Sequence, residues 1–190
     1  MRYIYLAALI LFLLSLCTTG FAADNLVVEL HTSKGLVVVE LDKKNARVTT
    51  ENFVQYVESG FYNGTVFHRV IPNFMVQGGG MTPDMKEKKT RPAIRNEADN
   101  GLLNEKYTIA MARTNDPHSA TAQFFINTKD NGFLDYKSPS GSSWGYCVFG
   151  KVIEGMDVVD AIEQVQTGNV GFHENVPVDA VIIEKAVLRK

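Results

Sequence analysis

One arginine lies among apolar and aromatic residues in the stretch FHRVIPNFMVQGGG, residues 67–80. A guanidinium stays protonated at physiological pH and presents several donors in a rigid plane, so Arg69 could stabilise an acceptor that forms during a reaction. A strand with one solvated polar face would produce the same pattern. From the residues alone we therefore favour the ordinary interpretation, in which Arg69 is a solvated strand residue.

The other residues that carry chemistry form no familiar catalytic arrangement. The four histidines show no pair at metal-ligand spacing and have no cysteine partners, so no metal or cofactor is expected. His118 and Ser119 are adjacent, but no nucleophile-elbow pattern surrounds Ser119, and adjacency in sequence does not make a catalytic triad. The glycines at 78–80 lack the lysine and the spacing of a phosphate-binding loop.

The composition is that of an ordinary globular protein behind an apolar leader. Of the 190 residues, 45% are hydrophobic and 21% are charged, and a net charge of −2 offers no field for nucleic acid. The basic Arg2 precedes an uncharged run at 3–17 and then small residues, which is the order of a signal peptide cleaved after about Ala22. The run is shorter than the roughly 20 residues that span a bilayer. We predict a signal peptide at 1–22 and one domain at 23–190.

Two alternatives for this leader are a retained membrane anchor and a lipid-modified Cys17. Leu16 is bulky where a lipoprotein processing site requires a small residue, so we favour removal of the leader. Removal leaves Cys147 as the one cysteine, and no disulfide within the chain is then possible. Cys147 lies in the apolar run YCVFGKV and is expected to be a small buried hydrophobe rather than a nucleophile.

The mature chain contains no linker, repeat or low-complexity tract. NLVVELHTSKGLVVVELD predicts a hairpin around Ser33-Lys34-Gly35. A helix should follow, with Thr49 or Thr50 as its N-cap and Ser59-Gly60 at its end, and a second helix has apolar residues every three positions at 156–165. Short strands are predicted at 66–70, 74–77, 108–112, 124–127, 148–152 and 181–188. Many short strands and only two helices favour an antiparallel barrel or sandwich with helices at its ends.

Two blocks of the sequence resemble the signature blocks of a known family. The first block is FHRVIPNFMVQGGG, and the second, about thirty residues later, is MARTNDPHSATAQFFINTKDNGFLD. They are similar to those of the cyclophilins, the peptidyl-prolyl cis-trans isomerases. The similarity continues through GYCVFGKV and the following helix, and so covers the chain from about residue 25 to its end. NEADNGL and NFVQYVESGFYNGTVFHRVIP further resemble the exported bacterial members.

The resemblance implies a closed eight-stranded antiparallel β-barrel capped by two α-helices, with a substrate groove on its surface and no cofactor. It implies that the catalytic residues are Arg69, Phe74 and Gln77. It implies that the walls of a proline pocket include Met75, Phe125, Leu134 and Tyr146. The residue before the proline would be bound by Ala112, Arg113 and Gln123.

The reaction of this family gives Arg69 a chemical purpose. Amide resonance sets a barrier of about 18–20 kcal/mol, whereas the two isomers of an X–Pro bond differ by only about 0.5–1 kcal/mol, so catalysis concerns rate alone. As the bond twists, the proline nitrogen loses conjugation and becomes a better hydrogen-bond acceptor. Given the resemblance, we expect Arg69 beside the proline pocket rather than on a solvated strand face.

Some positions depart from the common pattern of the family. Phe133 stands where many members have a tryptophan that contacts cyclosporin, so only weak cyclosporin binding is expected. Tyr146 replaces a histidine and keeps an aromatic face with an added hydroxyl. Arg113 and Pro117 also differ from the common eukaryotic pattern, which bears on the preference for the residue before proline.

We expect an exported prolyl isomerase that assists the folding of exported proteins in a bacterial periplasm, with secretion as the second choice of location. It should be a monomer that binds unfolded or flexible proline-containing polypeptides and, after cleavage, no membrane. The alternative from another class is a chaperone or binding module with incidental turnover; Arg69 favours catalysis, because a binder needs the pocket but not this donor. A third is a eukaryotic secretory protein glycosylated at Asn63-Gly64-Thr65, although the C-terminal VLRK carries no ER-retention signal.

Overall fold

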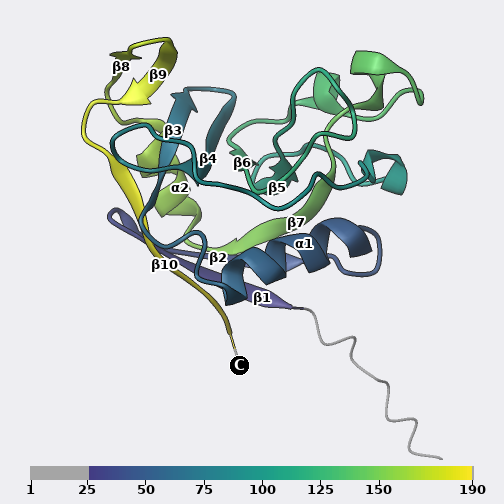
Figure 1. Cartoon of the computed structure of the whole chain (residues 1–190), viewed down its shortest axis with the longest axis horizontal. Coiled ribbons are helices and arrows are strands. Elements are labelled where there is room, and N and C mark those ends of the chain that lie inside the picture. Colours follow the sequence, from purple (N-terminus) through teal and green to yellow (C-terminus); the bar gives the residue numbers. More distant parts are fainter. Residues whose placement is uncertain (1–25, 190) are drawn as a thin grey trace, which may run out of the picture.

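The computed structural model describes residues 26–189, and the predicted signal peptide lies outside the described residues. Eight strands close into a barrel in the order β1-β10-β3-β4-β6-β5-β7-β2, and every neighbouring pair is antiparallel (Figure 1). These strands are β1 (Val27–Thr32), β2 (Gly35–Leu41), β3 (Thr65–Ile71), β4 (Met75–Met81), β5 (Thr108–Met111), β6 (Phe124–Asn127), β7 (Val148–Glu154) and β10 (Val181–Leu188).

The remaining elements of the described chain lie outside this barrel. Helix α1 (Arg47–Glu58) follows β2, and helix α2 (Met156–Glu163) follows β7. A separate hairpin of β8 (Thr167–Val170) and β9 (His173–Pro177) forms its own two-stranded sheet. None of the helices in residues 26–189 is long and apolar enough to cross a membrane. The loops contain three short 3-10 helices: η1 (Ala98–Asn100), η2 (Gly132–Leu134) and η3 (Gly141–Trp144).

Side chains alternate along each strand and so form two separate apolar clusters. In β6, Phe124 and Ile126 join the large cluster that fills the barrel, while Phe125 between them joins a smaller one. An outward face of an antiparallel sheet is normally polar, so this second cluster marks a covered or functional surface. We call it the outer cluster, and its buried members are Met75, Ala110, Phe125, Leu134 and Val148.

Helix α1 begins earlier than predicted and is capped by a distant carboxylate. It starts at Arg47, so the predicted cap at Thr49 or Thr50 is wrong. Instead, the Glu97 carboxylate accepts hydrogen bonds from the backbone N–H groups of Val48 and Thr49, at 3.1 and 2.8 Å. These bonds satisfy two free donors of the first turn and place a negative charge at the positive end of the helix dipole.

The other predicted elements are confirmed: the strands predicted at 124–127 and 181–188 have the predicted bounds, and the others differ at one or both ends. The largest difference is in β4, which runs to Met81 instead of residue 77. Helix α1 does end before Ser59-Gly60, and the second predicted helix is α2. Cys147 is buried, and burial raises the pKa of its thiol to about 12, which confirms the prediction of an unreactive core residue. The β8–β9 hairpin was not predicted.

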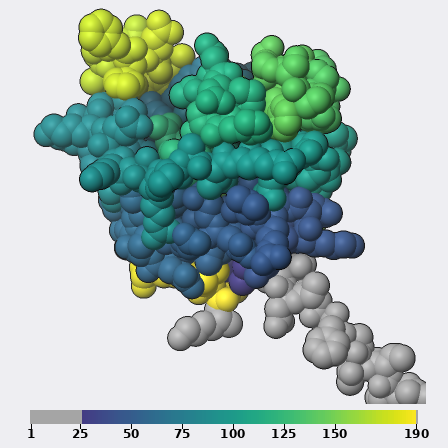
Figure 2. Space-filling model, turned by 45° about the vertical axis from the view of Figure 1, so that its right-hand side comes forward, coloured from purple at the N-terminus to yellow at the C-terminus, as the bar shows by residue number. Residues whose placement is uncertain are grey.

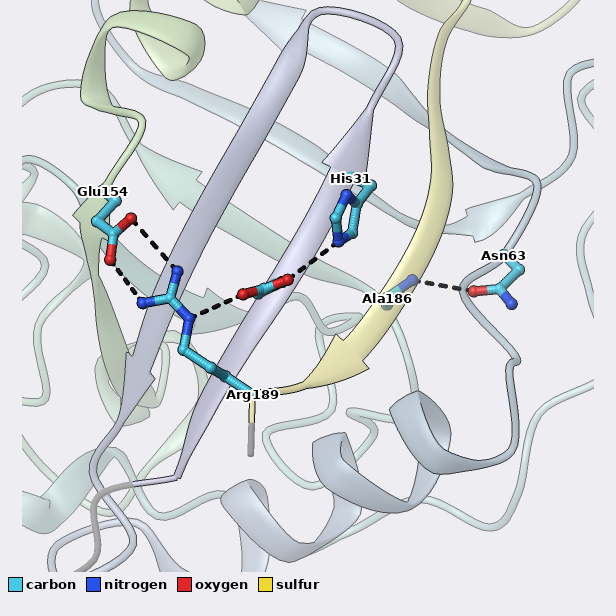
Figure 3. Close-up of polar contacts among 6 residues, drawn as sticks. His31, Asn63, Glu154, Ala186 and Arg189 are labelled. Atoms are coloured by element: carbon cyan, nitrogen blue, oxygen red, sulfur yellow. Dashed lines mark hydrogen bonds and ion pairs between the residues drawn. The ribbon is translucent and has the colours of Figure 1, made fainter.

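A network of ion pairs joins the end of β10 to its neighbour β1 and to the more distant strand β7, and we call it the terminal seam. Arg189, directly after β10, donates from Nε to Glu29 of β1 at 2.8 Å, and its two terminal nitrogens lie 2.6 and 3.3 Å from the carboxylate oxygens of Glu154 of β7 (Figure 3). His31 Nε2 lies 3.1 Å from the other oxygen of Glu29. The hydrogen-bonded guanidinium lowers the pKa of both carboxyl groups.

Candidate active site

Arg69 belongs to a row of side chains that crosses the outer surface of the barrel. Arg69 of β3 pairs with Gln77 of β4, Gln77 with Phe125 of β6, and Phe125 with Ala110 of β5. Residues paired across antiparallel strands project to the same side of the sheet. Phe125 and Ala110 belong to the outer cluster, so the row places a cation and an amide beside an apolar floor.

A small pocket of about 130 Å³ opens over this row. Its apolar and aromatic members supply walls for a compact ring, and its two arginines and one glutamine supply donors. We call it the proline pocket, and it is lined by Arg69, Phe74, Met75, Gln77, Ala112, Arg113, Phe125, Leu134 and Tyr146. The pocket therefore gathers nine of the eleven predicted site residues, which are separated in the sequence by up to 77 positions (146 − 69).

Within residues 26–189, the guanidinium of Arg69 has no hydrogen-bond or ion-pair partner although its side chain is half-buried. A partly buried donor without a partner loses hydrogen bonds to water and gains none from the protein, so it costs free energy in the unliganded state. These donors are available to a group that enters the pocket. All the other arginines of the described chain have partners, namely Arg47, Arg91, Arg95, Arg113 and Arg189.

Gln77 is oriented by a second glutamine. Its Nε2 donates to Oε1 of Gln123 at 3.0 Å. Gln123 in turn packs against Gly80, where an added Cβ would lie 2.4 Å from Gln123 Cγ. Gly79 has a φ of +80°, and an added Cβ there would lie 2.7 Å from the Phe124 ring. The glycine run thus allows close packing of β4 against the core at Phe124 and against Gln123, the residue that orients Gln77.

Arg113 and Tyr146 form one wall of the pocket as a stacked pair. The guanidinium of Arg113 lies 4.5 Å from the centroid of the Tyr146 ring, and its Nε donates to the Gly145 carbonyl at 2.9 Å. Gly145 has a φ of +69°, and an added Cβ would lie 2.6 Å from the Leu134 carbonyl oxygen. Only glycine therefore lets the segment carrying Tyr146 approach the segment carrying Leu134 so closely. Arg113 is committed to this wall.

Two predicted residues border the pocket without lining it. Gln123 lines a neighbouring hollow of about 290 Å³, which shares Gln77, Ala112 and Arg113 with the proline pocket. Phe133 is 65% exposed and stacks on Phe74, with ring centroids 5.6 Å apart. The structure therefore brings all eleven residues into one region, with nine in the pocket and two at its edges.

Three buried asparagines support the pocket and were missed in the sequence. The amide nitrogen of Asn131 donates to the Phe74 carbonyl and to Asn127 Oδ1, each at 2.8 Å. Asn127 donates to Asn104 Oδ1 at 3.3 Å, and Asn104 donates from its backbone to the Asp135 carboxylate at 2.7 Å. Buried amides are costly unless they are hydrogen-bonded. An asparagine directly after the apolar run FFI was therefore the available signal.

His68 is the buried neighbour of Arg69. Burial lowers the pKa of its imidazole to about 4, so the ring is neutral at neutral pH and places no second positive charge beside Arg69. Its Nδ1 has no hydrogen-bond partner in the described part of the chain. No group of three or more His, Cys, Asp or Glu within residues 26–189 is arranged to hold a metal ion.

Comparisons with known proteins agree with this geometry. Residues 27–188 match the family described as "Cyclophilin type peptidyl-prolyl cis-trans isomerase/CLD". The peptidyl-prolyl cis-trans isomerase cyp18 of Streptomyces antibioticus is 62% identical over 159 residues, which cover 84% of this chain and 96% of that protein. Peptidyl-prolyl cis-trans isomerase B of Escherichia coli (strain K12) is 53% identical over 162 residues, which cover 85% of this chain and 99% of that protein.

A solved structure supports the fold at a greater distance. The cyclophilin type peptidyl-prolyl cis-trans isomerase of Cryptosporidium parvum superposes with a TM-score of 0.72 at 23% identity, and the match covers 87% of this chain and 98% of that one. The closed barrel with two helices is thus the cyclophilin fold. With the family match spanning nearly all of the described residues, the chain belongs to the cyclophilin family and is a peptidyl-prolyl cis-trans isomerase.

Proposed function

We propose that the proline pocket is the site of isomerisation and that Arg69 is its catalytic residue. The observation that carries this proposal is the half-buried guanidinium of Arg69, which lines the pocket and has no partner within residues 26–189. A structural arginine would have found an acceptor, as Arg113 did in the same pocket. Free donors at the edge of an apolar pocket suit a group that becomes an acceptor only during the reaction.

In the proposed mechanism, the proline ring enters the pocket against Phe125, Met75 and Leu134. Gln77 holds the substrate backbone, and the carbonyl of the preceding residue rotates about the C–N bond. The proline nitrogen pyramidalises as conjugation is lost, and the Arg69 guanidinium donates a hydrogen bond to its lone pair. This bond is stronger in the twisted state than in the planar amide, so it lowers the barrier rather than merely improving binding.

The expected contribution of Arg69 follows from the strength of such a bond. A hydrogen bond to a charged group is worth about 1.5–3 kcal/mol, and each 1.36 kcal/mol corresponds to a tenfold change in rate. Arg69 should therefore supply about ten- to a hundredfold. The remainder comes from immobilising the ring while the carbonyl turns, and from the low local dielectric of the pocket.

An NMR exchange experiment on an X–Pro peptide tests this role. The mature domain should accelerate exchange between the cis and trans forms, Arg69→Ala should lose about ten- to a hundredfold of that acceleration, and Arg69→Lys should recover part of it. All three proteins should unfold at similar denaturant concentrations. Equal rates for the native protein and Arg69→Ala would contradict the mechanism, and peptide binding without exchange in both would favour the chaperone alternative.

We further propose that the enzyme is exported and assists the folding of proline-containing polypeptides in a bacterial periplasm. The order of charge, apolar run and small residues at 1–22 supports export. Asn63 Oδ1 accepts a hydrogen bond from the backbone N–H of Ala186 at 3.0 Å (Figure 3). This bond ties a loop to β10 through the amide oxygen, and an N-linked glycan would attach at the amide nitrogen, so the contact does not decide on the eukaryotic alternative.

Expression of the full chain in a Gram-negative host tests the export proposal. The mature protein should be recovered by osmotic shock with its N-terminus at or near Ala23. Recovery of the uncleaved chain from the cytoplasm or the membrane fraction would contradict the proposal. A Cys17→Ala variant should be processed identically, whereas loss of membrane attachment in that variant alone would indicate lipidation.

A further inference from the structure

The β8–β9 hairpin stands outside the barrel and carries a fully exposed aromatic side chain. Strand β9 contacts β3, the strand that carries Arg69, and the hairpin projects from the body of the molecule (yellow in Figure 2). Phe172 in its turn is fully exposed, while Val170 and Val178 are 49% and 62% exposed. Three of the seven large apolar side chains exposed within residues 26–189 therefore belong to this hairpin or directly follow it.

A hollow beside the turn of the hairpin shares Arg69 with the proline pocket. Its volume is about 270 Å³. The hollow that contains Gln123 meets the pocket through other residues, so the two hollows approach the proline pocket through different walls. Besides Arg69, the hairpin hollow is lined by His68, Phe172, His173 and Glu174.

We propose that the turn of the β8–β9 hairpin is a binding subsite for the substrate segment that follows the proline. The inference rests on the proposed function of the proline pocket. The resemblance assigns Ala112, Arg113 and Gln123 to the residue before proline, so the chain that leaves the pocket past Arg69 is the segment after it. Phe172 then contacts an apolar side chain one to three positions after the proline, a stretch that spans about 10 Å when extended.

The residues of the subsite define the preferred substrate. An exposed aromatic ring gains free energy by covering an apolar or aromatic partner. Glu174 and Arg69 line the same hollow as an acidic and a basic residue, so selectivity for the substrate side chain is assigned to the aromatic ring rather than to charge. We therefore expect the enzyme to prefer an apolar residue over glycine after the proline.

Two peptides that differ only in the second residue after proline, leucine in one and glycine in the other, test the subsite. The native domain should show a kcat/KM about three- to tenfold higher for the leucine peptide. Phe172→Ser should remove this preference by lowering the value for the leucine peptide, mainly through KM. The fully exposed side chain makes no packing contribution, so this variant should fold normally. Leu103→Ser, which removes another exposed apolar side chain at a residue that lines neither the proline pocket nor the hairpin hollow, is the matched control and should keep the preference.

The outcomes separate this proposal from the one on which it rests. A native protein with no preference, or a Phe172→Ser variant that keeps it, would overturn the subsite. So would a loss of equal size in Leu103→Ser. The proposed function is judged independently by Arg69→Ala on the glycine peptide, which does not depend on Phe172. Loss of turnover in Arg69→Ala together with an unchanged preference in Phe172→Ser would remove the subsite alone.

Discussion

Two arginines on the outside of the barrel have different surroundings. Arg189 in the terminal seam is 36% exposed and donates to carboxylates on two strands, while Arg69 is half-buried and has no partner in the described chain. The more exposed arginine has acceptors for its donors and the more buried one has none, so burial does not explain which guanidinium is saturated. A guanidinium that the fold has saturated fastens strands together, and one that the fold leaves unsaturated can act on a substrate.

The strongest test of this division uses two glycines with clashing backbone neighbours, one in each region. Gly155 near the seam has a φ of +83°, and an added Cβ would lie 2.1 Å from the Leu36 carbonyl oxygen. Gly155→Ala should lower the free energy of unfolding by about 2–4 kcal/mol, because neither backbone can yield without strain. The remaining folded protein should keep its exchange rate, measured by NMR at a temperature where it is folded.

Gly145→Ala, in the pocket wall, provides the contrast. Its added Cβ would meet the Leu134 carbonyl oxygen at 2.6 Å, so stability should fall by a similar amount. Here the rate should fall as well, because Tyr146 is displaced with its neighbour. An equal loss of exchange rate in Gly155→Ala and Gly145→Ala would show that the terminal seam and the proline pocket do not have separate roles.

Acid should lower the free energy of unfolding of the domain through His68, the buried neighbour of Arg69. An unfolded histidine binds a proton near pH 6.5, while native His68 resists protonation until about pH 4, so the unfolded state binds more protons between these values. Stability is therefore lost as the pH falls through 6.5, and the loss should reach about 3 kcal/mol near pH 4.

The measurement for His68 is urea unfolding of the native domain and of His68→Gln across this pH range. Carboxylates contribute equally to both proteins, so the difference between the two curves isolates the imidazole. The difference should change by most of the stated amount between pH 7 and pH 4. Parallel curves would show that the imidazole is not held neutral.

A smaller effect is expected at the terminal seam. Arg189→Gln should lower the midpoint of thermal unfolding slightly, by less at high salt, because exposed ion pairs are weak and screened. The guanidinium lowers the pKa of Glu29 and Glu154. Their contribution is therefore present above pH 4.5 and lost as the pH falls through the lowered native values. The exchange rate of Arg189→Gln should match that of the native domain. A loss of rate would show that the terminal seam influences the proline pocket.

The smallest effect on rate is expected at Phe133, on the rim of the pocket. Phe133→Trp should change the exchange rate by less than about twofold, since Phe133 does not line the pocket. It should tighten cyclosporin binding by up to about tenfold, because tryptophan offers a larger surface and an N–H donor. Calorimetric titration with cyclosporin measures this. Unchanged affinity would place the difference from strongly binding cyclophilins elsewhere in the groove.

The local pattern of the sequence was sufficient for the barrel strands but not for all other elements. The short apolar run FFI corresponds to a strand because it has the length of a strand and is apolar on both faces, and all four residues of β6 are buried. The start of α1 was misplaced because its cap is Glu97, 49 positions from Val48, and no local signal points to it. The β8–β9 hairpin was missed because TGNVGFHENVP contains few alternating apolar residues, and its position depends on contact with β3.

The site was less accessible to local reasoning than the fold. The residues that flank Arg69 in the sequence predict a solvated side chain, and only the resemblance to cyclophilins predicts a place beside a pocket. Its lack of a partner is a property of the folded chain, since it requires every potential acceptor to lie elsewhere. The supporting asparagines could not be predicted for the same reason. Their buried amide network forms only when the fold brings Asn104, Asn127 and Asn131 together.

Closure of the barrel has a consequence for an enzyme whose substrates are proline-containing polypeptides. Each barrel strand is hydrogen-bonded to a neighbour on both sides, so this sheet has no free edge. A free edge would template the pairing of an extended polypeptide and start aggregation. An enzyme built on a closed barrel can instead bind such a chain through the side chains of a shallow groove and then release it. Turnover of a polypeptide substrate is thereby separated from the backbone pairing that would trap it.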